Sequence, residues 1–354
     1  MGSVAGTIVA PAGEVRGTVR MDGQRIVAVD AAGPDRAVPE RYVVPGFVDL
    51  QVNGHEDVDC ATAEGADWEL LDRLLLAQGV TTWCPTLVTA PLETYTGSLG
   101  RIAAAAARPA HGRRCVAGAH LEGPFLGGAP GAHNRDWLVP IDLGWIDRLP
   151  QAVKVLTLAP ELAGAGEAVR LLTSRGVLVG LGHSTCTYEE AEAAADAGAR
   201  LVTHLFNGMA PLHHRRPGLA GAALADARLT PSLIADGVHV HPAVLRAAMA
   251  ATPCILVTDA VARRRPHGGQ GVTVTDAPRL DDGTLAGTAL TMDRAIRTVA
   301  VPLQEAVAAV SARPAALLWL HDRGRVEPGL RADLVALTPG LDVEQVWVGG
   351  EPAL

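Results

Sequence analysis

The sequence predicts an α/β fold, a (β/α)8 TIM-type barrel with a small β-sandwich formed from the N- and C-terminal segments. Short β-branched runs alternate with amphipathic helical stretches through the middle of the chain, and both ends hold only short strands and turns. The chain has 354 residues, 48% of them hydrophobic, which is enough to bury a barrel core and a small additional unit.

Eight apolar runs bounded by turn residues are expected to form the barrel strands, and helical stretches follow most of them. The strands are predicted at 42–49, 80–89, 115–122, 153–160, 177–183, 201–206, 232–240 and 255–259. Helices are predicted at 68–78, 95–108, 166–174, 188–197, 243–251, 292–301 and 303–310. The link between residues 205 and 232 is less clearly helical. This order of strand–helix units indicates a closed parallel barrel.

Neither end of the chain is long enough to bury a core of its own. Short strand-like runs occur at 18–20, 25–29, 333–337 and 345–348. We therefore expect the two ends to pair as one small β-sandwich. The chain then divides into residues 1–43 and 325–354 for the sandwich and residues 44–324 for the barrel.

Charge and cysteine usage exclude several classes of protein. The formal net charge is −8, whereas a nucleic-acid-binding protein usually presents a basic face. No apolar run reaches the roughly 20 residues of a membrane-spanning helix, and the N-terminus does not resemble a signal peptide. The five cysteines are scattered, as expected for free thiols in a reducing compartment. We expect a cytoplasmic protein with a small-molecule ligand and no nucleic-acid or membrane partner.

Residues able to bind a metal ion or move protons follow five of the predicted strands. A lone histidine there is more often a hydrogen-bonded structural residue, and a lone aspartate is often a helix N-cap. Five together indicate a functional site, because the carboxyl ends of barrel strands converge on one mouth. The residues are Glu122, His183, His204, the Asp236–His239 segment and Asp259.

Such a set fits metal-assisted hydrolysis. Two imidazoles and one carboxylate can bind a divalent ion and leave a position for water. The ion lowers the pKa of that water, and a further carboxylate can take its proton and return it to a leaving group.

At these residues the sequence closely resembles the N-acetylglucosamine-6-phosphate deacetylase family of the amidohydrolase superfamily. The matching motifs run in order along the barrel region, and the strand-rich ends also fit the superfamily. The motifs lie at 45–54, 85–87, 120–125, 131–134, 158–161, 182–184, 203–209, 216–221, 234–239, 257–260 and 283–287.

The resemblance implies a role for each residue of the set. Glu122, His183 and His204 would bind one divalent metal ion per chain, zinc or iron(II). Asp259 would be the general base and then the acid that protonates the departing amine, and His239 would hydrogen-bond the amide carbonyl.

The resemblance also implies a sugar-phosphate site and a homodimer. Main-chain amides at Asn207 and Gly208 would donate to the phosphate, and Arg215 would reach it from the neighbouring subunit. The residues around the substrate would be Gln51, Ala132, His133, Asn207, Gly208, Arg215, Asp236, His239, Leu285, Ala286 and Gly287.

Gln51 and Asn53 stand where most of the superfamily has two histidines that bind a second metal ion. Gln and Asn are poor zinc ligands, so this pair predicts a single-metal site. In an alternative interpretation the two amides only hydrogen-bond in the barrel mouth, and both interpretations can hold.

The chain departs from the family pattern at three places. Residues 55–59 replace the usual glycines and Asp-Phe pair, and Arg135 stands where proline is usual. The segment 261–279 is short and carries Arg263–Arg265, which are either a solvated face or a replacement anion contact.

The activity we expect is hydrolysis of N-acetylglucosamine 6-phosphate to glucosamine 6-phosphate and acetate, in amino-sugar catabolism. A first alternative is the same chemistry on another N-acyl sugar or a cyclic amide, which the departures keep open. A second is a catalytically silent homologue, although the complete set of Glu122, His183, His204 and Asp259 argues against it. Metal content and acetate release distinguish these possibilities.

Overall fold

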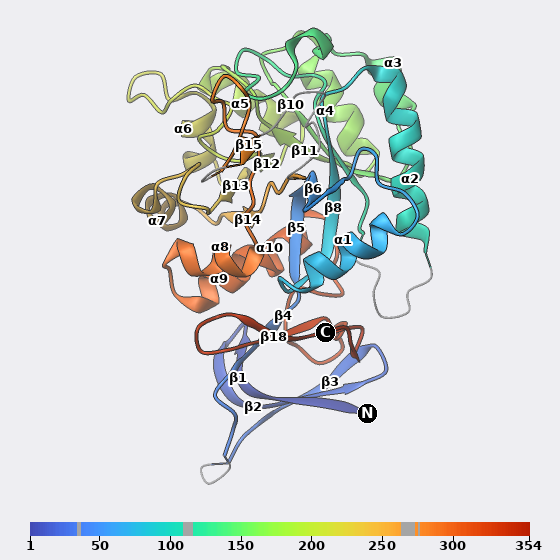
Figure 1. The fold of residues 1–354 in the computed structure, drawn as a ribbon. Coiled ribbons are helices and arrows are strands. Elements are labelled where there is room, and N and C mark those ends of the chain that lie inside the picture. Colours follow the sequence, from blue (N-terminus) through green and yellow to red (C-terminus); the bar gives the residue numbers. More distant parts are fainter. Residues whose placement is uncertain (34–36, 109–115, 263–272, 275–276) are drawn as a thin grey trace.

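The computed structural model describes residues 1–33, 37–108, 116–262, 273–274 and 277–354, which form a barrel with a separate sheet below it (Figure 1). Eight strands form one sheet in the order β14-β13-β12-β11-β10-β9-β8-β5, and every neighbouring pair is parallel. Val52 forms a parallel bridge with Ala260, which closes the barrel between its first and last strands. The strands are β5 (Phe47–Val52), β8 (Val80–Val88), β9 (Ala119–Glu122), β10 (Val153–Leu158), β11 (Leu178–Leu181), β12 (Leu201–Val202), β13 (Thr230–Ile234) and β14 (Ile255–Val257).

Helices pack around these strands, and most of them begin within two residues of their predicted starts. The helices are α1 (Asp67–Leu76), α2 (Tyr95–Ala107), α3 (Leu143–Asp147), α4 (Ala165–Ser174), α5 (Tyr188–Ala197), α6 (Gly218–Ala225), α7 (Pro242–Ala251), α8 (Met292–Val299), α9 (Leu303–Val310) and α10 (Ala312–Leu317). A capping box, in which Thr187 and Glu190 satisfy each other's backbone N–H groups, fixes the start of α5. Within the described residues, every helix is too short or too polar to span a bilayer.

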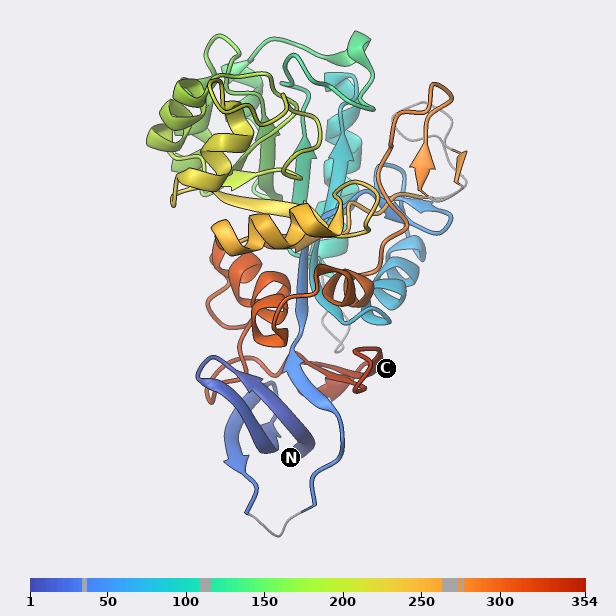
Figure 2. The ribbon, with the colours of Figure 1, turned by 90° about the vertical axis from the view of Figure 1, so that its left-hand side faces the viewer.

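The two ends of the chain form one seven-stranded mixed sheet with an apolar core of its own, so the predicted small β-sandwich is confirmed (Figure 2). Its order is β19-β18-β17-β4-β1-β2-β3. The strands are β1 (Gly2–Ala10), β2 (Gly13–Asp22), β3 (Arg25–Ala31), β4 (Tyr42–Pro45), β17 (Leu334–Leu337), β18 (Val343–Val348) and β19 (Glu351–Pro352).

The strand predicted at 42–49 is wrong as a single element. Tyr42–Pro45 pairs with the terminal strands, Phe47–Val52 begins the barrel, and Gly46 separates them. A Cβ at Gly46 would lie 2.1 Å from Thr81 Oγ1, so only glycine allows the chain to pass this closely. The predicted boundary between residues 43 and 44 therefore falls inside β4, and we propose that the barrel begins at Gly46.

The strands predicted at 201–206 and 232–240 are too long at their C-terminal ends. β12 ends at Val202 and β13 at Ile234, so the polar residues that follow belong to loops. Two short antiparallel pairs also stand outside the barrel sheet: β6 (Gly54–His55) with β7 (Val58–Asp59), and β15 (Thr273–Val274) with β16 (Pro278–Arg279).

Candidate active site

Three of the predicted site residues share the same placement after a barrel strand and the same left-handed backbone conformation. His183, His204 and Asp259 each come two residues after the end of a barrel strand, and their φ angles are 50°, 34° and 48°. Left-handed backbone is uncommon for residues other than glycine and costs on the order of 1–3 kcal/mol. Such strain persists only where the surrounding fold enforces it, and it is concentrated at functional sites.

Glu122, His183 and His204 converge on one point. Glu122 Oε1 lies 3.0 Å from His183 Nε2 and 2.8 Å from His204 Nε2, and the two Nε2 atoms are 3.1 Å apart. Each Nδ1 lies 3.2 Å from a backbone carbonyl, that of Ala129 or Asn207. Because Nδ1–H donates to a carbonyl, the Nε2 lone pairs point at the carboxylate, an arrangement typical of histidines that bind a metal ion.

His133 stands at the edge of this cluster, and Glu122, His133 and His183 also lie close enough to hold an ion. Two observations favour His204 over His133 as the third ligand. His133 Nε2 is 3.9 Å from the nearest Glu122 oxygen, a longer distance than either of the other histidines shows. In addition, His133 Nδ1 accepts a hydrogen bond from the N–H of Thr89 at 3.3 Å, so the proton of a neutral His133 resides on Nε2.

The cluster is buried, and the neighbouring histidines determine whether Glu122 is ionised. Burial alone raises the pKa of Glu122, but the close approach of the His183 and His204 imidazoles outweighs burial and holds that pKa well below the usual range. Glu122 therefore presents a carboxylate to the two imidazoles, which together form a donor set that suits a divalent cation.

Asp259 lies beside the cluster and is held by two amides. Its Oδ1 accepts hydrogen bonds from Asn53 Nδ2 at 2.7 Å and from Gln51 Nε2 at 3.2 Å, and Gln51 Nε2 also lies 3.0 Å from Glu122 Oε1. The hydrogen-bonding interpretation of Gln51 and Asn53 is thus confirmed. Burial, reinforced by the charge of Glu122, raises the pKa of Asp259 above its usual range.

His239 is oriented by Asp236. Asp236 Oδ2 lies 2.6 Å from His239 Nδ1, and Asp236 Oδ1 accepts the backbone N–H groups of Val238 and His239, each at 2.8 Å. Burial raises the pKa of Asp236, but the interactions with His239 outweigh it and lower that pKa. An ionised Asp236 requires the proton on His239 Nδ1.

These groups open into a cavity of about 350 Å³. The predicted residues that line it are Glu122, Ala132, His133, His183, His204, Asn207, Gly208, His239, Asp259, Leu285 and Gly287. Residues that were not predicted as site residues also line it, and all but Arg279 lie within the matching motifs: Gly131, Ile234, Arg279, Gly283 and Thr284. Arg279 ends the shortened segment, so the departure from the family pattern was the signal that could have identified it.

Four predicted substrate residues do not line this cavity. Gln51 is hydrogen-bonded to the lining residue Asp259, and Asp236 to the lining residue His239. Ala286 is fully buried. Arg215 is exposed, with Nη1 2.8 Å from His214 Nε2, so it does not enter the cavity of its own chain. Arg263–Arg265 lie outside the described residues.

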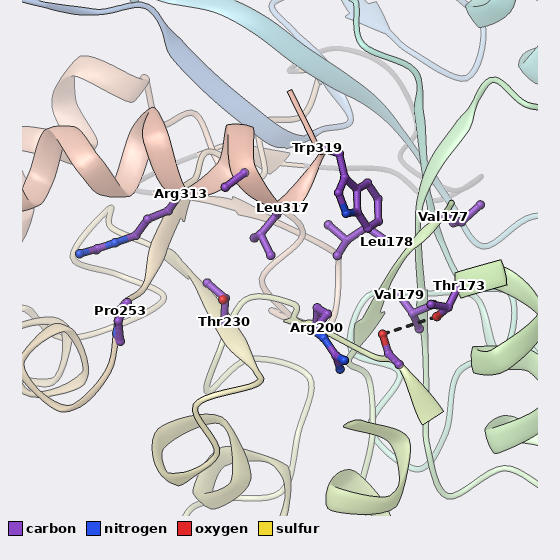
Figure 3. Close-up of a pocket in the computed structure, with 12 residues that line it drawn as sticks. Thr173, Val177, Leu178, Val179, Arg200, Thr230, Pro253, Arg313, Leu317 and Trp319 are labelled. Atoms are coloured by element: carbon purple, nitrogen blue, oxygen red, sulfur yellow. Dashed lines mark hydrogen bonds between the residues drawn. The ribbon is translucent and has the colours of Figure 1, made fainter. Parts of the chain in front are cut away.

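A second cavity, of about 420 Å³, lies at the opposite end of the barrel, where strands β11, β12 and β13 begin (Figure 3). Figure 3 shows Trp319, Leu317 and Arg313 around it, and Arg313 is already bound to Glu305 by two hydrogen bonds of 2.7 and 2.8 Å. None of the described residues that line it is a histidine, cysteine or carboxylate. Barrel enzymes have their active sites at the C-terminal ends of the strands, so the volume of this second cavity does not make it the candidate active site.

A (β/α)8 barrel with a carboxylate–imidazole cluster and a further carboxylate at its mouth is typical of metal-dependent hydrolases. The model of the amidohydrolase family matches residues 42–353, and the chain belongs to this family.

Relatives and solved structures agree with this assignment. The chain is 39% identical over 343 residues to the N-acetylglucosamine-6-phosphate deacetylase of Bos taurus, covering 87% of this chain and 82% of that protein. It is also 39% identical over 331 residues to the N-acetylgalactosamine-6-phosphate deacetylase of Escherichia coli O157:H7, covering 87% of each.

The fold matches solved deacetylases over nearly its whole length. The N-acetylglucosamine-6-phosphate deacetylase of Thermotoga maritima superposes with a TM-score of 0.93 at 31% identity, covering 99% of both chains. A mutant of the Mycobacterium smegmatis enzyme in complex with N-acetyl-D-glucosamine-6-phosphate superposes with a TM-score of 0.91 at 33% identity, covering 99% of this chain and 98% of that one.

Proposed function

We propose that this protein hydrolyses the acetamide of N-acetylglucosamine 6-phosphate to glucosamine 6-phosphate and acetate, in amino-sugar catabolism. The observation that carries the proposal is the cluster of Glu122, His183 and His204 beside Asp259 in a single cavity. The deacetylases at up to 39% identity support the choice of an N-acetyl sugar phosphate.

We assign one divalent ion, zinc or iron(II), to Glu122, His183 and His204. Bound there, the ion would lower the pKa of a water molecule and polarise the amide carbonyl. The amide nitrogens of Gln51 and Asn53 support a single ion, because both donate to carboxylates. Asn and Gln side chains bind metal ions through the amide oxygen, and here the nitrogens face the carboxylates instead.

Asp259 performs the proton transfers in this mechanism. It removes a proton from the attacking water as the water oxygen bonds to the carbonyl carbon. It then delivers that proton to the amide nitrogen while the carbon–nitrogen bond breaks, which releases acetate and the free amine. Its position beside Glu122 and His204 supports this role.

His239 stabilises the oxygen on which negative charge develops. Its Nδ1 is bound to Asp236, which orients the ring, and a protonated Nε2 is the donor that this role requires. A donor at this point lowers the barrier, because the carbonyl oxygen carries more charge in the transition state than in the substrate.

The remaining substrate contacts are proposed from the lining of the cavity and from the family. Ala132, His133, the main-chain amides of Asn207 and Gly208, and the segment Leu285–Gly287 would surround the sugar phosphate. The exposed position of Arg215 supports a homodimer in which this residue serves the neighbouring subunit. The free, buried cysteines Cys60, Cys84, Cys186 and Cys254 support a cytoplasmic location.

A second candidate substrate is N-acetylgalactosamine 6-phosphate, which differs only in the configuration of one hydroxyl group. The E. coli relative named for that substrate is as similar to this chain as the bovine enzyme. Acetate release from each phosphorylated sugar distinguishes the two substrates, with the Asp259→Asn variant as the inactive control. Metal-loaded protein that releases acetate from neither sugar contradicts the proposed function.

A further inference from the structure

The active-site cavity is lined by a cationic side chain to which neither the motifs nor the family resemblance assigned a role. Of the described residues that line the cavity, only Arg279 carries an Arg or Lys side chain. The phosphate of the proposed substrate is anionic, so a cationic side chain in the wall of this cavity is a candidate partner for it. Arg215, the expected phosphate ligand, lies exposed against His214 instead.

Arg279 is built into the wall of the cavity. It ends β16, forms an antiparallel bridge with Leu285, and is half-buried. Its Nη1 donates to the carbonyl of Gly283 at 3.0 Å, which fixes the orientation of the guanidinium. Gly283, Thr284 and Leu285 line the cavity with it, so the backbone and the cation form one surface.

We propose that Arg279 is a specificity-determining residue that binds the phosphate of the substrate within its own subunit, an inference that rests on the proposed function. A guanidinium presents five N–H donors in a planar fork that matches two phosphate oxygens, a contact that water or a neutral side chain cannot replace. The shortened segment 261–279 thereby supplies an anion contact through its last residue.

Steady-state kinetics separate this role from a structural one. Arg279→Ala should raise KM for the phosphorylated sugar by about ten- to a hundredfold, the effect of losing one charge-assisted hydrogen-bonded contact. Arg279→Lys should give a smaller increase, because it keeps the charge but loses the fork. The value of kcat should change little, and turnover of the unphosphorylated sugar should be unaffected. Arg246→Ala, which changes an exposed arginine of α7, is the matched control.

Equilibrium binding tests the inference independently of turnover. The affinity for glucosamine 6-phosphate, measured by calorimetry, should fall in Arg279→Ala and not in Arg246→Ala, while circular dichroism verifies that both variants are folded. Unchanged affinity in Arg279→Ala overturns the inference, as does an equal loss of affinity for glucosamine, which would place the contact on the sugar ring. If the parent protein binds glucosamine 6-phosphate through Arg279 but releases no acetate, the proposed function fails and the phosphate contact stands.

Discussion

Asn53 Nδ2 lies 2.7 Å from Asp259 Oδ1, and this contact fixes one oxygen of the proposed general base. The same oxygen accepts from Gln51, whereas Asn53 Oδ1 is buried with no partner in the described part of the chain. Asn53 therefore acts only as a donor here. Its hydrogen bond leaves the second oxygen of Asp259 for proton transfer.

Asn53→Ala should lower kcat by about ten- to a hundredfold and leave KM nearly unchanged, because Asp259 loses a charge-assisted hydrogen bond that orients it. Steady-state kinetics at saturating metal give both constants. Gln304→Ala is the matched control, since that amide donates to the carbonyls of Ala10 and Pro11, in the terminal sheet and its first turn. A variant with parental kcat would show that Gln51 alone positions the base.

The three histidines at or near the metal site are expected to differ in their effect on metal content. The parent protein should contain one divalent ion per chain, and His183→Ala and His204→Ala should lose it, because each removes one of three protein ligands. His133→Ala should keep the ion, because His133 Nδ1 is bound to Thr89 and its Nε2 lies 3.9 Å from Glu122. Elemental analysis of the purified proteins is the measurement. Two tightly bound ions in the parent, or loss of the ion from His133→Ala, contradicts the assignment.

Asp259→Asn should retain the metal ion and bind substrate but lose turnover by roughly 10²–10⁴-fold, the usual contribution of general acid–base catalysis. An amide cannot accept the proton of the attacking water, yet it keeps the shape of the carboxyl group and can still face Asn53 and Gln51. Acetate release and metal content are measured on the same preparation. Near-parental turnover would transfer the role of base to another residue, with His239 as the next candidate.

Asp49 provides a test based on pH and stability. It is fully buried, its Oδ2 accepts the hydroxyl of Thr258 at 2.6 Å, and burial raises its pKa to about 7. In the unfolded chain the same carboxyl titrates near about 4. Between these two values the folded protein binds more protons than the unfolded chain, so the contribution of Asp49 to stability is lost as the pH rises toward 7.

Asp49→Asn removes that titration and keeps an oxygen acceptor. The free energy of unfolding of the variant relative to the parent should therefore increase from pH 4 to pH 7, by at most about 1.4 kcal/mol per pH unit. Urea unfolding at a series of pH values measures the difference. Asp281→Asn, at an exposed position, should show no such trend. Parallel curves for the parent and Asp49→Asn would contradict the prediction.

The features that the sequence revealed depend on local patterns. Strands with apolar runs were recognisable, and Glu122, His183, His204 and Asp259 were found because polar residues directly follow those runs. Helix α6 was not recognised, because Gly218–Ala225 is small and apolar all round and lacks an amphipathic period.

Other features depend on contacts between distant segments. The entry of Arg279 into the cavity depends on a bridge to Leu285, and the passage from sheet to barrel at Gly46 depends on Thr81. Neither contact leaves a periodic signal in the sequence. The role of Asn53 as a donor to Asp259 likewise emerges only when the barrel closes between β5 and β14.

The proposed dimer makes a prediction about Arg215. If Arg215 serves the neighbouring subunit, Arg215→Ala should raise KM for the phosphorylated sugar by about tenfold or more through loss of a charged contact, even though the residue lies outside its own cavity. Sedimentation should show a dimer for the parent protein and for the variant. An unchanged KM would show that Arg215 does not contribute to phosphate binding and would leave Arg279 as the arginine that contacts the phosphate.

Subunit mixing then reveals which chain Arg215 serves. A dimer of one Arg215→Ala chain and one Asp259→Asn chain contains one site that has both its own Asp259 and the partner's intact arginine. Random exchange of equal amounts should therefore restore parental KM at about a quarter of all sites, because half of the dimers are mixed and each has one such site. If Arg215 serves its own subunit instead, no site regains both residues, and the mixture shows only the high KM of Arg215→Ala. The kinetics of the mixture before and after exchange decide between the two arrangements.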